Sequence, residues 1–189
     1  MRIIAGEWRG RRISFPSAAQ LRPTPDRVRE TLFNWLQPAI AGARCLDLFA
    51  GSGALGLESL SRGAAAAVFV EHDVAVVAAL RATLSTLRAT RGQLIEMDAS
   101  RYLAGPATAF DVVFLDPPFA RGGLGELCRL LETRGWLAPR AFVYLEQPAH
   151  DPAAALPDGW AEWRELRAGD VRARLTRREP AAQTRVDDK

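Results

Sequence analysis

The sequence predicts an α/β protein with a Rossmann-like, doubly wound, mostly parallel seven-stranded sheet and an antiparallel C-terminal hairpin. Three observations support this prediction. From residue 43 short apolar runs alternate with helical patterns, a glycine-rich turn follows the first run, and two alternating runs close the chain. The 189 residues are 48% hydrophobic and 25% charged, which is typical of one globular domain and excludes a disordered chain or a disulfide scaffold.

The N-terminal residues 1–40 are predicted to form a small basic extension, and residues 41–179 the core. In residues 2–15, β-branched and aromatic residues are interspersed with Gly6 and Gly10 in turn-like positions, which indicates a hairpin.

A helix is expected next, with Pro25 and Asp26 in its first turn and its end near Leu36. Its apolar stripe comprises Val28, Leu32, Trp35 and Leu36. Arg27 and Arg29 would project from its flank.

The predicted core consists of strands joined by helices. The strands are 44–49, 66–71, 93–97, 110–115, 141–146, 160–167 and 171–178, and the helices are 53–62, 74–89 and 122–133. A core-facing stripe in the second of these helices comprises Val77, Leu80, Leu84 and Leu87. In such sheets ligands bind beyond the carboxyl ends of the strands. Residues 180–189 are expected to be a disordered tail.

Basic charge is concentrated at the N-terminus. The net charge is +3, of which residues 1–30 carry +4 and the rest of the chain −1. The basic residues of this segment are Arg2, Arg9, Arg11, Arg12, Arg22, Arg27 and Arg29. A basic cluster beside a near-neutral body is typical of phosphate binding, so the charge favours a nucleic-acid partner. A general arginine bias would explain the residue type but not the clustering.

The remaining composition indicates a cytoplasmic protein without a metal centre. Cys45 and Cys128 lie in separate apolar segments without a CxxC pair, and the chain has two histidines. The longest apolar run, 64–70, is far short of the ~20 residues that a membrane helix needs. Residues 1–12 contain no apolar signal region. We therefore expect neither a membrane partner nor zinc.

A glycine-rich turn follows the first predicted strand. Gly51, Ser52 and Gly53 lead into a helix, and Gly56 completes a Gly-x-Gly-x-x-Gly spacing. Glycine lets the backbone approach a ligand, and a helix N-terminus offers N–H groups to a carboxylate or phosphate. Glu71, 20 residues after Gly51, ends the second strand, where it can accept hydrogen bonds from ribose hydroxyls. The pattern alone fits a dinucleotide, another nucleoside ligand, or tight helix–strand packing.

Two aspartates narrow the choice of ligand. Asp47 ends the first strand, where a carboxylate would repel a pyrophosphate but can help to hold the ammonium group of S-adenosylmethionine. Asp98 follows the third strand and, with Ala99, is placed to contact adenine, whose amino group can donate to the carboxylate. Asp98 can also cap a short helix over 99–104, and both roles are compatible.

A second turn with candidate catalytic residues follows the fourth strand and has the sequence Asp116-Pro117-Pro118-Phe119. The two prolines fix a rigid turn at the carboxyl edge of the sheet and leave the Pro117 carbonyl without a regular strand partner. The Asp116 carboxylate and this carbonyl form an acceptor pair that can grip both hydrogens of an exocyclic amine. Phe119 would stack on the face of the base. A strand-ending turn with a buried phenylalanine is the structural alternative.

These motifs resemble known methyltransferase signatures. DLFAGSG with Glu71 resembles the S-adenosylmethionine loop of class I methyltransferases, and DPPF resembles the [DN]PP[YFW] signature of enzymes that methylate adenine N6, cytosine N4, guanine N2 or protein glutamine. RIIAGEWRGRRI, LRPTPDRVRETLFNWL, LDLFAGSGALGLESLSRGA and DPPF, in this order, closely resemble the RsmD family of bacterial 16S ribosomal RNA guanine-N2 methyltransferases. The resemblance covers about residues 1–178. Pro25, Ala173 and Thr176 depart from the family pattern.

The resemblance implies a role for each candidate residue. It assigns Asp47, Gly51, Gly53, Glu71 and Asp98 to S-adenosylmethionine, and Asp116, Pro117 and Phe119 to the target base. It assigns Arg9, Arg11, Arg12, Arg22, Arg27 and Arg29 to RNA phosphates or to a cover over the active site. It also implies a cytoplasmic monomer that acts on 16S ribosomal RNA in an assembling 30S subunit.

Three other interpretations explain part of the pattern. A protein glutamine methyltransferase would share the loop and DPPF but have no use for the basic hairpin. A nicotinamide oxidoreductase would explain the glycines and Glu71 but not Asp47 or DPPF. A non-catalytic RNA-binding assembly factor would need only the basic face. The short N-terminal segment leaves no room for a separate DNA-recognition domain, which favours a structured RNA substrate.

Overall fold

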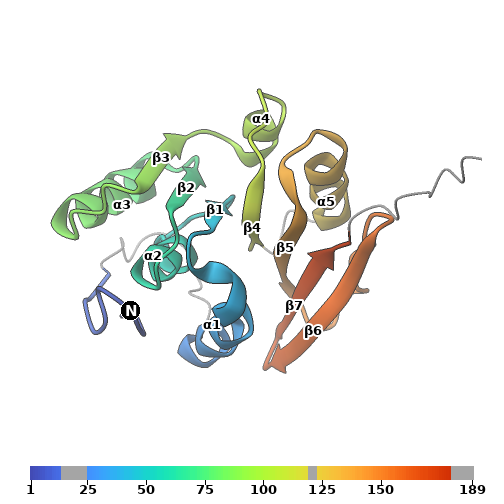
Figure 1. Ribbon diagram of the computed structural model, residues 1–189, viewed down its shortest axis with the longest axis horizontal. Helices are drawn as coiled ribbons and strands as arrows, with labels where there is room; N and C mark the ends of the chain where they lie inside the picture. The colour runs from blue at the N-terminus through green and yellow to red at the C-terminus, as the bar shows by residue number, and fades with distance from the viewer. Residues whose placement is uncertain (14–24, 119–122, 180–189) are drawn as a thin grey trace, which may run out of the picture.

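The computed structural model describes residues 1–13, 25–118 and 123–179. Its centre is a seven-stranded sheet with the strand order β3-β2-β1-β4-β5-β7-β6 (Figure 1). The strands are β1 (Arg44–Asp47), β2 (Ala66–Glu71), β3 (Gly92–Glu96), β4 (Phe110–Leu115), β5 (Leu137–Pro148), β6 (Trp160–Ala168) and β7 (Val171–Arg178). β1 to β5 pair in parallel and β7 pairs antiparallel with both β5 and β6, which confirms the predicted Rossmann-like sheet with its closing hairpin.

Five helices surround the sheet within the described residues. They are α1 (Asp26–Ile40), α2 (Ala54–Ser61), α3 (Val74–Thr86), α4 (Ala99–Leu103) and α5 (Leu124–Thr133). One face of the sheet shares its core with α1, α2 and α3, and the other face shares its core with α4 and α5. Because helices cover both faces, the central strands are apolar throughout rather than alternating.

Most elements differ from the sequence-based expectation at one end or both, and the differences in β1, β5 and α1 have a clear physical reason. β1 ends at Asp47 rather than at residue 49, because the chain leaves the sheet there to form the glycine turn. β5 runs from Leu137 to Pro148 because its two ends pair with different neighbours, Leu137 with β4 and Pro148 with β7. α1 continues past Leu36 and through Pro38 to Ile40, whose side chain is buried in the core.

The N-terminal hairpin packs against the end of α2. Ile3 donates from its N–H to the Arg11 carbonyl at 3.0 Å, and a single antiparallel bridge joins Arg2 and Arg12. Glu58 of α2, which is fully buried, accepts from the N–H groups of Ile4 at 2.7 Å and Ala5 at 3.0 Å.

Further contacts fix the hairpin in place. Ser61 Oγ accepts from the Trp8 N–H at 3.0 Å and donates to the Ala5 carbonyl at 2.5 Å. Gly6 lies so close to this serine that a Cβ would come within 1.8 Å of the Ser61 carbonyl oxygen. Ile3, Trp8 and Ile13 belong to the same hydrophobic core as α1 and α2. The hairpin is therefore bound to the core through buried polar and apolar contacts.

Candidate active site

The glycine turn connects β1 to α2 and has a conformation that requires glycine. Gly51 and Gly53 have positive φ angles of 50° and 77°, and Gly53 is the residue that precedes α2. A Cβ on Gly53 would lie 2.5 Å from Leu80 Cδ1. Because these positions carry no side chain, the backbone N–H groups at the start of α2 are accessible to a ligand. Ser52, between the two glycines, is half-buried.

The third glycine of the spacing serves packing. A Cβ on Gly56 would lie 2.2 Å from the Phe69 ring of β2. The packing interpretation therefore holds for Gly56, while the first two glycines shape the turn.

Two buried carboxylates brace this turn. Asp47 Oδ2 accepts from the Gly56 N–H at 3.0 Å, and Glu71 Oε2 accepts from the Gly51 N–H at 3.0 Å. The other Glu71 oxygen accepts from the N–H groups of His72 at 2.8 Å and Asp73 at 2.9 Å. The sequence predicts ligand contacts for both acids but does not reveal their bonds to the backbone of the turn.

Asp47 is electrostatically suited to a positively charged ligand. It is 2% exposed, and burial raises its pKa to about 7, with the negative charge of Glu71 adding to the increase and the Gly56 N–H opposing it. A buried carboxylate in this state is stabilised by any cation that binds beside it. The zwitterionic end of S-adenosylmethionine carries such a cation, so the residues present fit this cofactor.

Asp98 occupies the position that precedes α4 and caps it. One carboxylate oxygen accepts from the N–H groups of Ser100 at 2.9 Å and Arg101 at 3.2 Å, which confirms the predicted helix-capping role. Ala99 is buried in the first turn of α4. A contact of these two residues with adenine stays a prediction.

The Asp-Pro-Pro turn lies at the carboxyl edge of the sheet, one strand from the glycine turn. β4 is the direct neighbour of β1, and Phe114 pairs with Asp47. Asp116 is half-buried, Pro117 is buried and Pro118 is exposed. The structure thus brings the predicted acceptor pair and the predicted cofactor turn to adjacent strand ends. Phe119 lies outside the described residues.

Two residues of this edge were not predicted. Tyr144 and Glu146 of β5 are 0% and 3% exposed, and the tyrosine hydroxyl donates to Glu146 Oε2 at 2.7 Å. The sequence does contain a signal for Glu146, because the predicted strand 141–146 ends in an acid just as the predicted strand 66–71 does at Glu71, although β5 continues to Pro148. An acid in this position is unusual for a core strand and indicates a polar edge.

The predicted RNA-contacting arginines divide into two groups. Arg9, Arg11, Arg12 and Arg27 are exposed. Arg29 is fully buried and donates to the Arg2 carbonyl at 2.9 Å and to Asp26 at 2.7 Å. The prediction that Arg29 contacts RNA is therefore wrong, because its guanidinium ties α1 to the hairpin. Arg22 lies outside the described residues.

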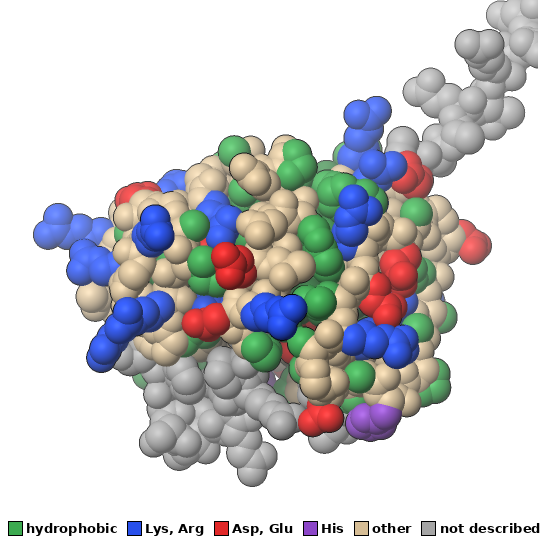
Figure 2. Space-filling model, turned by 90° about the horizontal axis from the view of Figure 1, so that it is seen from below, with side chains coloured by type: hydrophobic (Ala, Val, Ile, Leu, Met, Phe, Trp, Pro, Cys, Tyr) green, Lys and Arg blue, Asp and Glu red, His purple; other side chains and the backbone are tan. Residues whose placement is uncertain are grey.

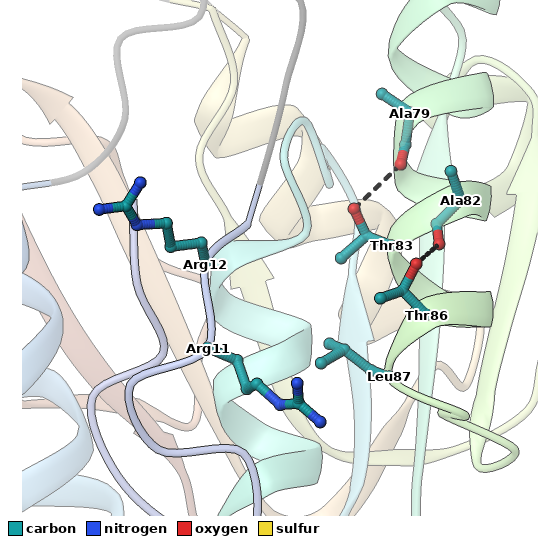
Figure 3. Close-up of a pocket in the computed structure, with 7 residues that line it drawn as sticks. All are labelled: Arg11, Arg12, Ala79, Ala82, Thr83, Thr86 and Leu87. Atoms are coloured by element: carbon teal, nitrogen blue, oxygen red, sulfur yellow. Dashed lines mark hydrogen bonds between the residues drawn. The ribbon is translucent and has the colours of Figure 1, made fainter.

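The exposed hairpin arginines border a cavity. It has a volume of about 430 Å³ and lies between the hairpin and α3, lined by Arg11, Arg12, Ala79, Ala82, Thr83, Thr86 and Leu87. Arg11 extends towards the end of α3 at Leu87, while Arg12 points away from the helix (Figure 3). Several arginine side chains stand at the end of the molecule that carries the hairpin and α3 (Figure 2). This end offers positive charge to an extended anionic partner.

Two other kinds of site have no support in the part of the chain described. Residues 1–13, 25–118 and 123–179 contain no group of three or more His, Cys, Asp or Glu that could hold a metal ion. Within the same residues, no helix is long and apolar enough to cross a membrane.

This sheet order, with a glycine turn after the first strand and an acceptor turn after the fourth, is that of the class I methyltransferases that use S-adenosylmethionine, and the chain is one of them. More narrowly, it belongs to the RsmD family, since the family model described as "Conserved hypothetical protein 95" matches residues 1–177.

Similar proteins agree with this assignment. The Ribosomal RNA small subunit methyltransferase D of Escherichia coli K12 is 49% identical over 187 residues, which is 99% of this chain and 94% of the relative. The protein of the same name from Haemophilus influenzae is 43% identical and covers 93% of this chain and 92% of its own length. The solved structure of the Escherichia coli methyltransferase yhhF superposes with a TM-score of 0.89 at 50% identity and covers 95% of this chain and 98% of its own.

The raised pKa of Asp47 leads to a testable pH dependence. Because a bound cation favours the ionised carboxylate, affinity for S-adenosylmethionine should increase about tenfold between pH 5.5 and 7.5, as Asp47 ionises through its pKa of about 7. Above about pH 8 the affinity should decrease again, because the ligand's own amino group loses its proton. Titration calorimetry at a series of pH values measures this. Asp47→Asn should remove the increase below pH 7, and a variant that keeps the wild-type profile would contradict the assignment.

Proposed function

We propose that this chain transfers a methyl group from S-adenosylmethionine to the exocyclic N2 amine of a guanine in 16S ribosomal RNA. The observation that carries the proposal is the Asp116-Pro117 acceptor turn, which lies one strand from the glycine turn. The relatives named as small-subunit ribosomal RNA methyltransferases support the RNA class, and the sequence resemblance to guanine-N2 enzymes supports the base and the atom. The exposed hairpin arginines supply contacts to phosphate.

The reaction depends on positioning rather than on a strong base. The lone pair of a guanine amine is delocalised into the ring, so acceptors on both of its hydrogens orient the amine and increase the electron density on nitrogen. The Asp116 carboxylate and the Pro117 carbonyl are these acceptors. When bound, S-adenosylmethionine supplies a methyl group from a positively charged sulfur, and this sulfur is left as a neutral thioether. The amine loses one proton as the N–C bond forms, and Asp116 is placed to accept it.

The cofactor is held at the neighbouring strand end, by the glycine turn after β1 and the acids around it. Gly51, Ser52 and Gly53 present the backbone of the turn to it, and Asp47 is placed beside its ammonium group. Glu71 and Asp98 have carboxylate oxygens with acceptor capacity beyond their backbone bonds, which suits ribose hydroxyls and the adenine amino group. Ala99, in the first turn of α4, completes this part of the site.

In our proposal the substrate is structured 16S RNA within an assembling 30S subunit in the cytoplasm. The enzyme acts as a monomer. Residues 1–40 would provide RNA contacts and residues 41–179 the catalytic core. Specificity would come from the shape of the particle, because unpaired bases in RNA can be turned into a pocket.

Methyl transfer measured directly tests the proposed function. Tritiated S-adenosylmethionine is incubated with the protein and with purified 30S particles, naked 16S RNA or total cell protein, and labelled RNA is digested to nucleosides. We expect label in N2-methylguanosine and a preference for particles over naked RNA. Label in protein would transfer the assignment to the glutamine class. Absence of label despite cofactor binding would favour a non-catalytic assembly factor.

The hairpin arginines should determine the salt dependence of RNA binding. Replacing Arg11 and Arg12 by alanine should weaken binding and reduce the slope of log affinity against log salt by about 0.7 to 0.9 for each phosphate that is no longer bound. Filter binding at several salt concentrations measures this slope. Arg140→Ala, which replaces an exposed arginine in β5, is the matched control. A slope unchanged in the double variant would exclude these residues from the interface.

A further inference from the structure

Glu146 lies at the carboxyl edge of the sheet next to Asp116. β4 and β5 are parallel neighbours in which Phe114 pairs with Tyr144 and Leu115 with Leu145. The next residues along the chain are Asp116, directly after the end of β4, and Glu146, which lies within β5 two residues before its end and pairs with Ala173 of β7. Each of these acids lies two residues after an aromatic residue, Phe114 or Tyr144, of the core that α1 shares. The two rings meet edge to face with centroids 6.4 Å apart. The register thus brings Glu146 to the position beside the acceptor turn.

The Tyr144 hydroxyl lies close enough to both carboxylates to be affected by their charges. Burial, followed by the negative charges of Glu146 and Asp116, raises its pKa well above the ordinary value. The hydroxyl donates to Glu146 Oε2 at 2.7 Å, which fixes the orientation of the carboxylate. The hydroxyl is a positioning group for Glu146.

The chemistry of this pair of acids suits one kind of base edge. Guanine presents the N1–H donor directly next to the N2 amine, so both groups can donate to adjacent acceptors. Adenine presents an N1 lone pair next to its N6 amine, and this lone pair would face a carboxylate and be repelled. A buried carboxylate that needs a hydrogen-bond donor disfavours a base that has no donor at this position, because the carboxylate would be left unpaired.

We infer that Glu146 accepts the N1–H of the target guanine while Asp116 and Pro117 hold its N2 amine, and that Glu146 thereby selects guanine over bases with an unprotonated N1. The inference rests on the proposed function, since it concerns the base that enters that same site. It assigns to β5 a specificity-determining residue in addition to the acceptor turn of β4. Reading of a base on its Watson–Crick edge is a common property of enzymes that act on extruded nucleotides.

A substrate analogue separates this role from a structural one. Once the target position has been mapped by nucleoside analysis, 16S RNA is assembled by ligation with guanine, 2-aminopurine or inosine at that position and reconstituted into particles. 2-Aminopurine keeps the N2 amine but has a lone pair at N1. We expect wild-type protein to methylate guanine and to use 2-aminopurine poorly. Inosine, which lacks the amine, should accept no methyl group.

The variant Glu146→Gln makes the prediction specific. The glutamine amide can donate to the N1 lone pair of 2-aminopurine, so the ratio of kcat/KM for 2-aminopurine to that for guanine should increase about 10- to 100-fold. Tyr144→Phe, which removes only the hydroxyl that positions Glu146, should lower activity on guanine with a smaller change in the ratio. Glu132→Gln, on α5 where the acid pairs with Arg178, is the matched control and should leave the ratio unchanged.

Several results would overturn the inference. One is an equal decrease on guanine and 2-aminopurine in Glu146→Gln, since this is what a purely structural role predicts. Another is wild-type protein that uses both bases equally well, or a Glu146→Gln variant with an unchanged ratio. Failure of the proposed function is distinguishable, because wild-type protein would then transfer no methyl group to the guanine-containing particle.

Discussion

Replacement of Asp116 by alanine is expected to lower the rate of methyl transfer about 10³-fold while cofactor and RNA affinities change by less than about twofold. The carboxylate is one of two acceptors that orient the target amine, and the proton that the amine loses on methylation can pass to it or to water. Asp116 follows β4 directly at the carboxyl edge of the sheet, beside the glycine turn, so its removal should affect the transition state more than the ground-state complexes. Single-turnover transfer to 30S particles and calorimetry with S-adenosylmethionine measure the two effects separately.

Asp116→Asn is the matched control for this prediction. The amide oxygen still accepts a hydrogen bond, and the signature that DPPF resembles allows either residue at this position. We expect the asparagine variant to retain activity within about tenfold of wild type. An alanine variant with full activity would remove Asp116 from the chemistry. An asparagine variant that is fully folded but inactive would show that the negative charge, and not the acceptor geometry, is required.

The sheet was largely predictable because its strands are short apolar runs that helices cover on both faces. β2, β4 and β7 have the predicted bounds, and Gly51 and Glu71, which the predicted spacing pairs, are joined by a hydrogen bond. The boundaries that differed depend on tertiary pairing. β5, for example, gains residues at each end only because β4 and β7 extend beside it.

The candidate site was only partly predictable, and the reason is physical. Asp47, Glu71 and Asp116 were proposed because each lies at the end of an apolar strand beside a motif, whereas Glu146 lies within β5, two residues before its end, with no motif after it. Arg29 was misassigned because charge alone does not reveal burial. Its guanidinium is enclosed between α1 and the hairpin, a contact between segments 27 residues apart that no local pattern encodes.

Glu58 is expected to control attachment of the N-terminal hairpin, and with it RNA binding. The side chain is fully buried and accepts from the N–H groups of Ile4 and Ala5 and from Arg62 Nε at 2.7 Å. Glu58→Ala would leave these three donors without their acceptor, and an unmet buried donor costs ~1–3 kcal/mol. We expect the free energy of unfolding to decrease by about 3–5 kcal/mol, which urea denaturation measures.

The same variant should separate RNA binding from cofactor binding. When the hairpin loses its two anchoring bonds, the amides of Ile4 and Ala5 should exchange hydrogen much faster, and affinity for 30S particles should decrease because Arg9, Arg11 and Arg12 are no longer held in place. The glycine turn precedes α2, so cofactor affinity should remain close to wild type. Glu126→Ala, which removes an exposed ion pair with Arg129, should leave stability close to that of the wild type because solvent screens such a pair. Protected Ile4 and Ala5 amides in Glu58→Ala would show that apolar packing of the hairpin alone holds the RNA-binding surface on the core.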